Sequence, residues 1–305
     1  MGPSVEIVGR GVEMDAISAF LDGSSAPRAL ILRGDAGIGK TILWQHLVAG
    51  ARARGWAVAE SQPTESERRL SFASLADLVS AVPAATLDEL PERLRLALDV
   101  ALLRVAAVPT EQLAVSMAFS AVLTSVSSAG PVVAAIDDAQ WIDTPTARVL
   151  EFALRRTVDR EVRFALAVRS GESAPFVDAL LRVFPEPETR ILEVGPLSVG
   201  ALHHLFSSRL GQHFPRPTLV RLARAADGNP LVALEIARAL LESGERLLPG
   251  AQLPVSRSFG QLLSRRIVRL PGPTREALLD PRRRLPARWP LAMPNLCSSP
   301  PKRRA

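Results

Sequence analysis

The chain has 305 residues, of which 47% are hydrophobic and 22% are charged. This composition is ordinary for a globular protein and leaves room for roughly one to three domains. The single cysteine, Cys297, excludes a disulfide framework within the chain, and no signal peptide is visible. Charges interrupt apolar stretches such as residues 100–108, so we expect a cytoplasmic protein that has no membrane partner.

The net charge of +6 is concentrated in the last segment of the sequence. Residues 280–305 contain seven basic residues and one acidic residue, which is a net charge of +6 and leaves residues 1–279 at zero. A folded nucleic-acid-binding surface needs a concentrated positive charge, and the body of this chain has no such excess. We therefore expect a disordered basic tail and no sequence-specific DNA binding.

Taken in chain order, the first predicted elements surround a glycine-rich loop. A helical pattern covers residues 14–21, an apolar run over residues 29–32 predicts a strand, and residues 42–48 predict a helix. The loop between this strand and this helix has the spacing G-x-x-x-x-G-K-T, the signature of a phosphate-binding P-loop. The predicted nucleotide-binding residues here are Gly34, Asp35, Ala36, Gly37, Ile38, Gly39, Lys40, Thr41 and Ile42.

The residue types in this loop suit phosphate chemistry. Glycines let backbone N–H groups approach phosphate oxygens, and the following helix adds its positive dipole end. Lys40 is one of only two lysines, with Lys302, in a chain that otherwise uses arginine for its cations. A compact ammonium is not interchangeable with a planar guanidinium, so this lysine indicates a chemical requirement. We expect Lys40 to contact the β- and γ-phosphates and the Thr41 hydroxyl to bind Mg²⁺.

Further strands alternate with helices along the chain. We predict strands over residues 57–59, 131–136, 162–168 and 191–194. Three helices separated by Pro83, Pro91 and Pro109 account for residues 73–127, and another helix covers residues 145–156. This alternation predicts an α/β fold, a P-loop three-layer sandwich with a central parallel sheet.

Two of the predicted strands end in charged side chains. Asp137 and Asp138 follow one strand, and Arg169 follows the next. Because the carboxyl ends of parallel strands meet at one edge of a sheet, these residues should converge beside the P-loop. We expect Asp137 to support Mg²⁺, Asp138 to orient or deprotonate the attacking water, and Arg169 to contact the γ-phosphate. A solvated turn for the aspartates and a surface position for the arginine are the alternatives.

From residue 198 the pattern becomes entirely helical, and the break at Gly195-Pro196 is the predicted domain boundary. The predicted helices cover residues 198–210, 217–226, 231–243 and 257–270. Between two of them, the sequence D-G-N-P places Pro230 at the first position of a helix. We therefore predict a P-loop ATPase core over residues 1–195, a helical lid over residues 196–279 and a disordered tail over residues 280–305.

Together these motifs resemble the ATPase core of the large LuxR-type, MalT-like transcriptional regulators. That group belongs to the signal-transduction ATPases with numerous domains, a branch of the AAA+-like P-loop proteins. Besides the P-loop, V-G-R-G-V-E at residues 8–13 resembles the group's adenine-side segment, and D-D-A-Q-W-I-D at residues 137–143 is similar to its D-D-x-x-W-x-D motif. D-G-N-P-L at residues 227–231 also fits, and the resemblance covers roughly residues 5–279.

The resemblance implies further roles around ATP and Mg²⁺. Gly9 and Arg10 would line the adenine and ribose side, and Pro230 would approach the nucleotide from the lid. It also implies that ATP closes the lid and favours a homo-oligomer, and that hydrolysis to ADP is slow. An unknown inducer or regulatory protein would act on the chain.

Family-like sequence stops after residue 279, whereas the regulators continue through helical repeats to a C-terminal helix-turn-helix. Residues 280–305 have the arginine and proline bias expected of a GC-rich gene read out of frame. We therefore expect a truncated or frameshifted regulator that lacks the DNA-binding domain. The predicted function is an ATP-binding, slowly hydrolysing switch module. The alternative is a nucleotide-binding interaction scaffold without significant turnover.

Overall fold

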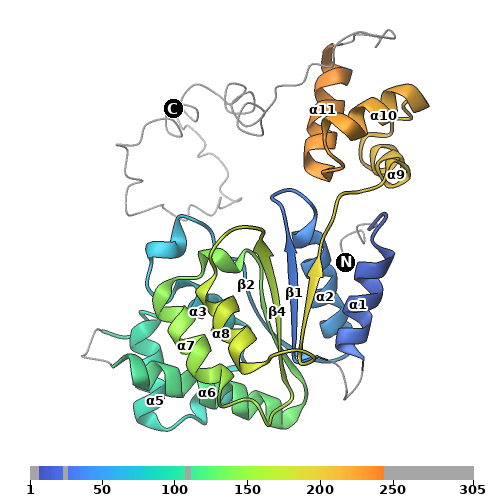
Figure 1. Cartoon of the computed structure of the whole chain (residues 1–305). Helices are drawn as coiled ribbons and strands as arrows, with labels where there is room; N and C mark the ends of the chain where they lie inside the picture. Colours follow the sequence, from blue (N-terminus) through green and yellow to red (C-terminus); the bar gives the residue numbers. More distant parts are fainter. Residues whose placement is uncertain (1–6, 23–26, 107–110, 244–305) are drawn as a thin grey trace, which may run out of the picture. The chain divides into compact units, whose positions relative to one another are not determined.

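The computed structural model describes residues 7–22, 27–106 and 111–243. Within these residues, five strands form one sheet in which all neighbouring strands are parallel (Figure 1). The strand order is β2-β3-β4-β1-β5, so the strand that precedes the P-loop lies between β4 and β5. The strands are β1 (Ala29–Gly34), β2 (Ala57–Ser61), β3 (Val132–Ile136), β4 (Val162–Arg169) and β5 (Thr189–Glu193).

Helices flank this sheet and continue beyond it. Along the sheet-forming part of the chain they are α1 (Gly11–Leu21), α2 (Lys40–Ala53), α3 (Ala73–Ser80), α4 (Ala84–Asp88), α5 (Glu92–Ala101), α6 (Gln112–Ala129), α7 (Thr144–Leu154) and α8 (Pro175–Val183). Two short 3₁₀ turns are η1 (Glu67–Arg69) and η2 (Ala139–Trp141). After β5 come three helices, here called the lid helices, α9 (Val199–Leu210), α10 (Arg216–Ala225) and α11 (Pro230–Ser243).

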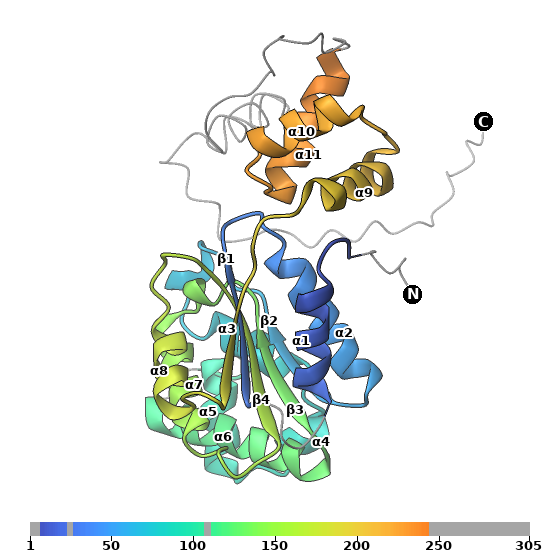
Figure 2. The ribbon, with the colours of Figure 1, turned by 45° about the vertical axis from the view of Figure 1, so that its right-hand side comes forward.

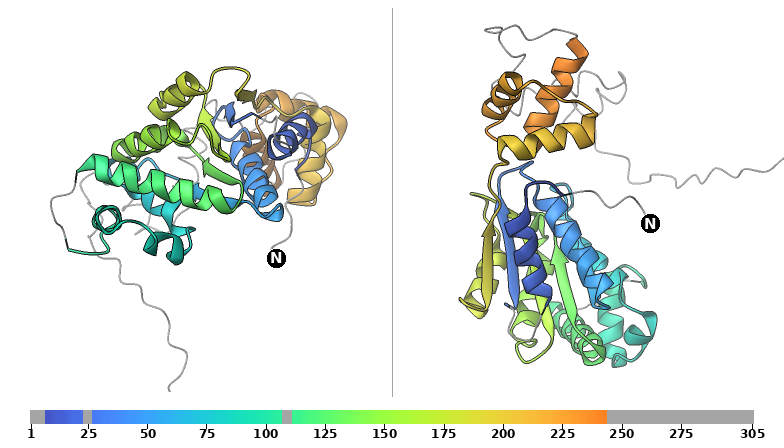
Figure 3. Two further views of the ribbon diagram at one scale, coloured as in Figure 1. Left: turned by 90° about the horizontal axis from the view of Figure 1, so that it is seen from below. Right: turned by 90° about the vertical axis from the view of Figure 1, so that its right-hand side faces the viewer.

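Side chains alternate between the two faces of the sheet, and each face carries its own apolar core. On β1, Ala29 and Ile31 join the core beneath α3 and α5 to α8, whereas Leu30 and Leu32 join the core beneath α1 and α2. Figures 2 and 3 show these two helical layers on opposite sides of the sheet. Burial on both faces explains why the strands read as continuous apolar runs. The predicted three-layer α/β fold with a parallel sheet is confirmed.

Two helices differ from the sequence-based prediction. Between residues 73 and 127, the described part of the chain (73–106 and 111–127) contains four helices and not three, because Pro83 and Pro91 flank the additional short helix α4. α8 was not predicted, although Phe176, Val177 and Leu180 have helical spacing and pack into the core. The segment is only nine residues long and follows a polar loop, so its periodicity is brief.

α6 is the one helix in the described ranges that is long and apolar enough to cross a membrane, judged by length and composition. Its 18 residues contain no charge, unlike the apolar stretch over residues 100–108. In the structure, Val115, Phe119 and Val122 are buried in the core between the sheet and neighbouring helices. α6 is therefore accounted for as a core helix, and the cytoplasmic location stays a prediction.

Asp143 fastens the segment after β3 to the helices around it. Its carboxylate caps α7 by accepting a hydrogen bond from the Thr146 N–H at 2.9 Å. It also accepts hydrogen bonds from the backbone N–H groups of Phe72 and Ser74, at 2.9 and 3.1 Å, where α3 begins. Because Asp143 is 1% exposed, one buried carboxylate holds the loop that carries Asp137 and Asp138 against two helices.

The lid helices pack on one another around Leu202, Phe206, Leu222 and Ile236. Ser198 caps α9 by accepting a hydrogen bond from its third N–H group at 3.2 Å. The predicted boundary at residue 195 stays a prediction. The predicted helix over residues 257–270 and the predicted tail over residues 280–305 lie outside the described residues.

Candidate functional site

The glycine-rich loop joins the end of β1 to the start of α2. Gly37 and Gly39 have φ values of 78° and 108°, in the left-handed region that glycine adopts without strain. A Cβ on Gly37 would lie 2.8 Å from the Leu231 side chain, and one on Gly34 would lie 2.7 Å from the Val194 carbonyl oxygen. Backbone conformation and close packing therefore require glycine at these three positions of the motif.

The Lys40 side chain lies inside the loop and is 6% exposed. Its Nζ donates hydrogen bonds to the carbonyl oxygens of Gly34 and Asp35, both at 2.9 Å. Burial lowers the pKa of Lys40, while the carboxylates of Asp138 and Asp137 act in the opposite direction. The loop thus holds a partly desolvated cation, which an anion placed in the loop would stabilise.

Asp137 stands at the carboxyl end of β3, beside the start of α2. It is 4% exposed, and its backbone N–H donates to the Ser61 carbonyl at 3.0 Å. Burial raises the pKa of Asp137, and a hydrogen bond from the Thr41 side chain acts against that rise. The structure therefore brings the two predicted Mg²⁺ ligands, a hydroxyl and a carboxylate, into direct contact.

Asp138, Gln140, Arg169 and Trp141 form a connected cluster, here called the Asp138 cluster. Gln140 Nε2 donates to Asp138 Oδ1 at 2.7 Å, and Gln140 Oε1 accepts from the Arg169 N–H at 3.3 Å. Arg169 Nε lies 3.5 Å from Asp138 Oδ1, and Arg169 Nη1 lies 3.5 Å from Glu172 Oε1. The Arg169 guanidinium also stacks on the indole of Trp141, 4.2 Å from the ring centre. Asp138 and Arg169, far apart in the sequence, are therefore paired.

The N-terminal segment contacts the P-loop through Arg10, which is 6% exposed. Arg10 donates to the carbonyl oxygens of Ile38 and Gly195, both at 2.7 Å, and pairs with Glu13 at 2.9 Å. Gly9 has φ 70° and approaches α9 so closely that a Cβ would lie 2.4 Å from an alanine side chain there. Arg10 ties three segments together, and its contact with adenine or ribose stays a prediction.

The start of α11 lies against the P-loop. Asn229 Nδ2 donates to the Ala36 carbonyl at 2.9 Å, and Asn229 Oδ1 accepts from the N–H groups of Leu231 and Val232 at 3.1 and 3.3 Å. One side chain therefore caps α11 and holds the P-loop at the same time. Pro230, the first residue of the helix, is consequently next to the loop, and its approach to the nucleotide stays a prediction.

A cavity of about 360 Å³ opens beside this contact. It is lined by Asp35 and Ile38 of the P-loop, by Gly195 after β5, and by Asp227 and Asn229 before α11. Its volume lies at the lower end of the range for small-molecule sites.

Of the predicted nucleotide-binding residues, Ile42 lies on α2 with 39% of its surface exposed.

The family model of the AAA ATPase domain matches residues 6–168 of this sequence. The chain belongs to the AAA ATPase domain family. The matched region of this AAA ATPase domain runs from the N-terminal segment into β4, and it includes the P-loop, Asp137 and Asp138. No curated protein matches the chain.

Solved structures are similar over a longer part of the chain. The ORC1 protein of Aeropyrum pernix, solved in complex with DNA, aligns with a TM-score of 0.51 and 17% identity over 86% of this chain. A Walker-type ATPase of Pyrococcus abyssi, PABY2304, aligns with a TM-score of 0.51 and 14% identity, over 86% of this chain and 72% of its own. The alignment spans 65% of the Aeropyrum protein. At these identities the similarity establishes the fold of the AAA ATPase domain alone.

Sequence reasoning assigned no role to three residues that organise this site. Gln140 joins Asp138 to the end of β4, Trp141 stacks on Arg169, and Asn229 joins α11 to the P-loop. Gln140 and Trp141 belong to the D-D-A-Q-W-I-D motif, and Asn229 belongs to the D-G-N-P-L motif. The available signal was the Gln140 amide two residues after Asp138, because a side-chain amide at this spacing can hydrogen-bond to a group in the same turn.

Proposed function

We propose that this AAA ATPase domain binds ATP with Mg²⁺ at the edge formed by the P-loop, Asp137 and the Asp138 cluster. The observation that carries the proposal is the enclosed Lys40 ammonium, which lies beside the Thr41–Asp137 pair. Phosphate oxygens would replace the two carbonyl oxygens that Nζ contacts, and the glycine backbone would supply N–H donors.

The residues at this edge fit the metal that the proposal includes. Mg²⁺ takes oxygen ligands, and the Thr41 hydroxyl and the Asp137 carboxylate are oxygen donors already in contact. When bound, the metal would neutralise charge on the phosphates. The raised pKa of Asp137 reflects a buried carboxylate without enough positive charge around it, which a cation would supply.

We infer that hydrolysis is slow because Asp138 is already occupied. Its Oδ1 accepts from Gln140 at 2.7 Å and faces Arg169 at 3.5 Å. For Asp138 to hold an attacking water, these partners have to release it or share it. The same engagement favours the second candidate function, an ATP-binding scaffold without turnover.

For the biological role of this ATP site, we propose that the domain is the ATP switch of a LuxR-type regulator. The D-D-A-Q-W-I-D and D-G-N-P-L motifs support this proposal, and the bond from Asn229 to Ala36 gives the lid helices a direct contact with the P-loop. ATP would bias this contact and so favour one lid position and a homo-oligomer. An inducer or regulatory protein would act on the same equilibrium.

The test combines calorimetric titration with ATP and with ADP, phosphate release under steady-state conditions, and light scattering with and without ATP. Saturable binding that needs Mg²⁺ is expected, with turnover well below one per second. Saturable binding with no phosphate release would favour the scaffold, and no binding would refute both functions. Reading the gene beyond codon 279 in three frames for a helix-turn-helix tests the regulator assignment.

A further inference from the structure

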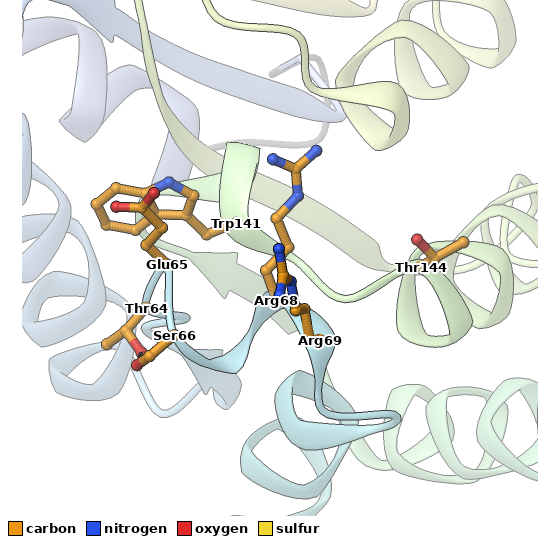
Figure 4. Close-up of a pocket in the computed structure, with 7 residues that line it drawn as sticks. All are labelled: Thr64, Glu65, Ser66, Arg68, Arg69, Trp141 and Thr144. Atoms are coloured by element: carbon orange, nitrogen blue, oxygen red, sulfur yellow. Dashed lines mark hydrogen bonds between the residues drawn. The ribbon is translucent and has the colours of Figure 1, made fainter. Parts of the chain in front are cut away.

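A second pocket shares Trp141 with the Asp138 cluster. Its volume is about 920 Å³, and we call it the η1 pocket. Figure 4 shows its lining side chains, which come from the segment after β2, from η2 and from the start of α7. They are Thr64, Glu65, Ser66, Arg68, Arg69 and Thr144, with Trp141.

Two cations in this pocket have no charged partner among the residues that the structure describes. Arg68 and Arg69 are exposed, and neither guanidinium forms an ion pair or a side-chain hydrogen bond within the described part of the chain. Among the described residues, the neighbouring Glu67 forms no ion pair with either arginine, and its carboxylate accepts hydrogen bonds from the Thr64 N–H at 3.0 Å and the Thr64 hydroxyl at 2.7 Å. Glu67 thus shapes the turn that presents the arginines.

Planar guanidinium groups bind carboxylate and phosphate groups through paired N–H donors, and an indole offers a flat apolar surface. We propose that the η1 pocket binds a small organic anion, with its phosphate or carboxylate on Arg68 and Arg69 and its apolar face on Trp141. A polynucleotide fits less well, because Glu65 also lines the pocket and residues 1–279 carry no net positive charge to form a longer basic track.

Trp141 connects this pocket to the Asp138 cluster. Its ring carries the Arg169 guanidinium at 4.2 Å, and Arg169 faces Asp138 at 3.5 Å. An anion that packs on the indole would therefore alter the placement of Arg169. This coupling rests on the proposed ATP function, and it is reciprocal: the factor by which the anion changes ATP affinity equals the factor by which ATP changes anion affinity.

Three probes that share a phenyl ring test the site: phenyl phosphate, benzoate and neutral benzyl alcohol. Binding is followed by ligand-observed NMR and calorimetry in the wild-type chain and in Lys40→Ala, which removes the phosphate cation of the P-loop. We expect one or both anions to bind with a Kd of roughly 1 mM in both proteins, and benzyl alcohol not to bind. The two anions distinguish a phosphate site from a carboxylate site. Because Lys40→Ala retains the η1 pocket, failure of ATP binding would leave this measurement interpretable.

The double variant R68Q/R69Q should weaken anion binding at least tenfold, with an unchanged circular dichroism spectrum. The matched control is R155Q/R156Q, an adjacent exposed arginine pair at the end of α7, which should bind the probes like wild type. Binding lost in Lys40→Ala but kept in R68Q/R69Q would overturn the proposal by assigning the anion to the P-loop. If R68Q/R69Q and R155Q/R156Q lose the same affinity for the anions, binding depends only on the overall charge of the protein, and the proposed site is refuted. If none of the three probes binds, the proposal is overturned. It is overturned equally if no probe binds but a ten-nucleotide single strand binds through Arg68 and Arg69, because the pocket would then be a nucleic-acid site.

Discussion

Asp137 and Asp138 are neighbours in the chain but have different surroundings. Asp137 is buried at the end of β3 and contacts the Thr41 hydroxyl. Asp138 has φ 47°, which turns its carboxylate away from the strand and toward Gln140 and Arg169. This left-handed residue separates the two side chains, so one can hold a metal while the other holds a water.

Lys40→Ala should weaken ATP binding about 100-fold or more while the fold persists. The substitution removes charge-assisted hydrogen bonds to the phosphates, each contributing about 1.5–3 kcal/mol. Fluorescent-ATP titration measures the loss. Arg33→Ala is the matched control, because Arg33 is a neighbouring cation that pairs with Glu193 on the sheet and should bind like wild type. Near-wild-type affinity in Lys40→Ala would refute the P-loop assignment.

Asp138→Asn should keep ATP binding and lower phosphate release about 100-fold or more. A neutral amide does not accept a proton from water, and general-base catalysis contributes about 10²–10⁴ in rate. Single-turnover phosphate release with bound ATP measures the effect. If Asp138→Asn hydrolyses ATP as fast as wild type, the water is held by another group.

Asp137→Asn should raise the melting temperature of the nucleotide-free protein at pH 7 and weaken the Mg²⁺ dependence of ATP binding. Burial raises the pKa of Asp137 above the usual 3.8, so its ionised form costs folding free energy at neutral pH. Wild type recovers this cost as the pH falls through the raised pKa, because the folded state takes up the proton first. Melting curves from pH 7 to pH 4 should therefore show the advantage of Asp137→Asn shrinking with acidity. An advantage that is constant with pH would contradict this assignment.

At the scale of elements, the loop after β3 is fixed by hydrogen bonds to the starts of α3 and α7 as well as by the strand that precedes it. Its last residue, Asp143, caps α7 and also accepts hydrogen bonds from the N–H groups of Phe72 and Ser74, where α3 begins. α3 itself contacts the edge strand β2. The candidate site thus depends on a helix junction at some distance from the P-loop.

Asp143→Ala should lower the free energy of unfolding by at least about 3 kcal/mol. Three N–H groups lose their acceptor, and an unsatisfied buried donor costs about 1–3 kcal/mol. Chemical denaturation measures the loss. Asp178→Ala provides the control, because Asp178 is an exposed acid in the first turn of α8 and its removal should change stability by under about 1 kcal/mol. Equal losses in both variants would show that Asp143 acts only through its charge.

At the scale of the whole molecule, the net positive charge and the candidate site belong to different parts of the sequence. All the net positive charge belongs to residues 280–305, whereas the candidate site and its AAA ATPase fold belong to residues before 243. A basic segment binds DNA through phosphates, without sequence preference and with steep salt dependence.

Deleting residues 280–305 should remove any DNA affinity and leave ATP binding and the melting temperature nearly unchanged. A competition gel shift near 150 mM salt and a melting curve of the shortened chain measure these outcomes. The full chain in the same gel should give no complex that survives competitor DNA. A surviving specific complex, or a large drop in melting temperature, would contradict the prediction that this segment is a disordered tail.

The sequence by itself determined the P-loop, the parallel sheet and, to within two residues, the bounds of α7 and the lid helices, because these depend on local spacing. Gly37 and Gly39 mark a left-handed turn that suits glycine, and close packing leaves no room for a side chain at Gly34. A run such as residues 131–136 marks a strand buried on both faces. Only the tertiary structure decided which side chains became partners. Asn229 reaches the Ala36 carbonyl across 193 residues, and Gln140 reaches the Arg169 N–H across 29. Such pairs follow from the order of strands in the sheet and from the packing of α11 on the P-loop, which no local pattern encodes.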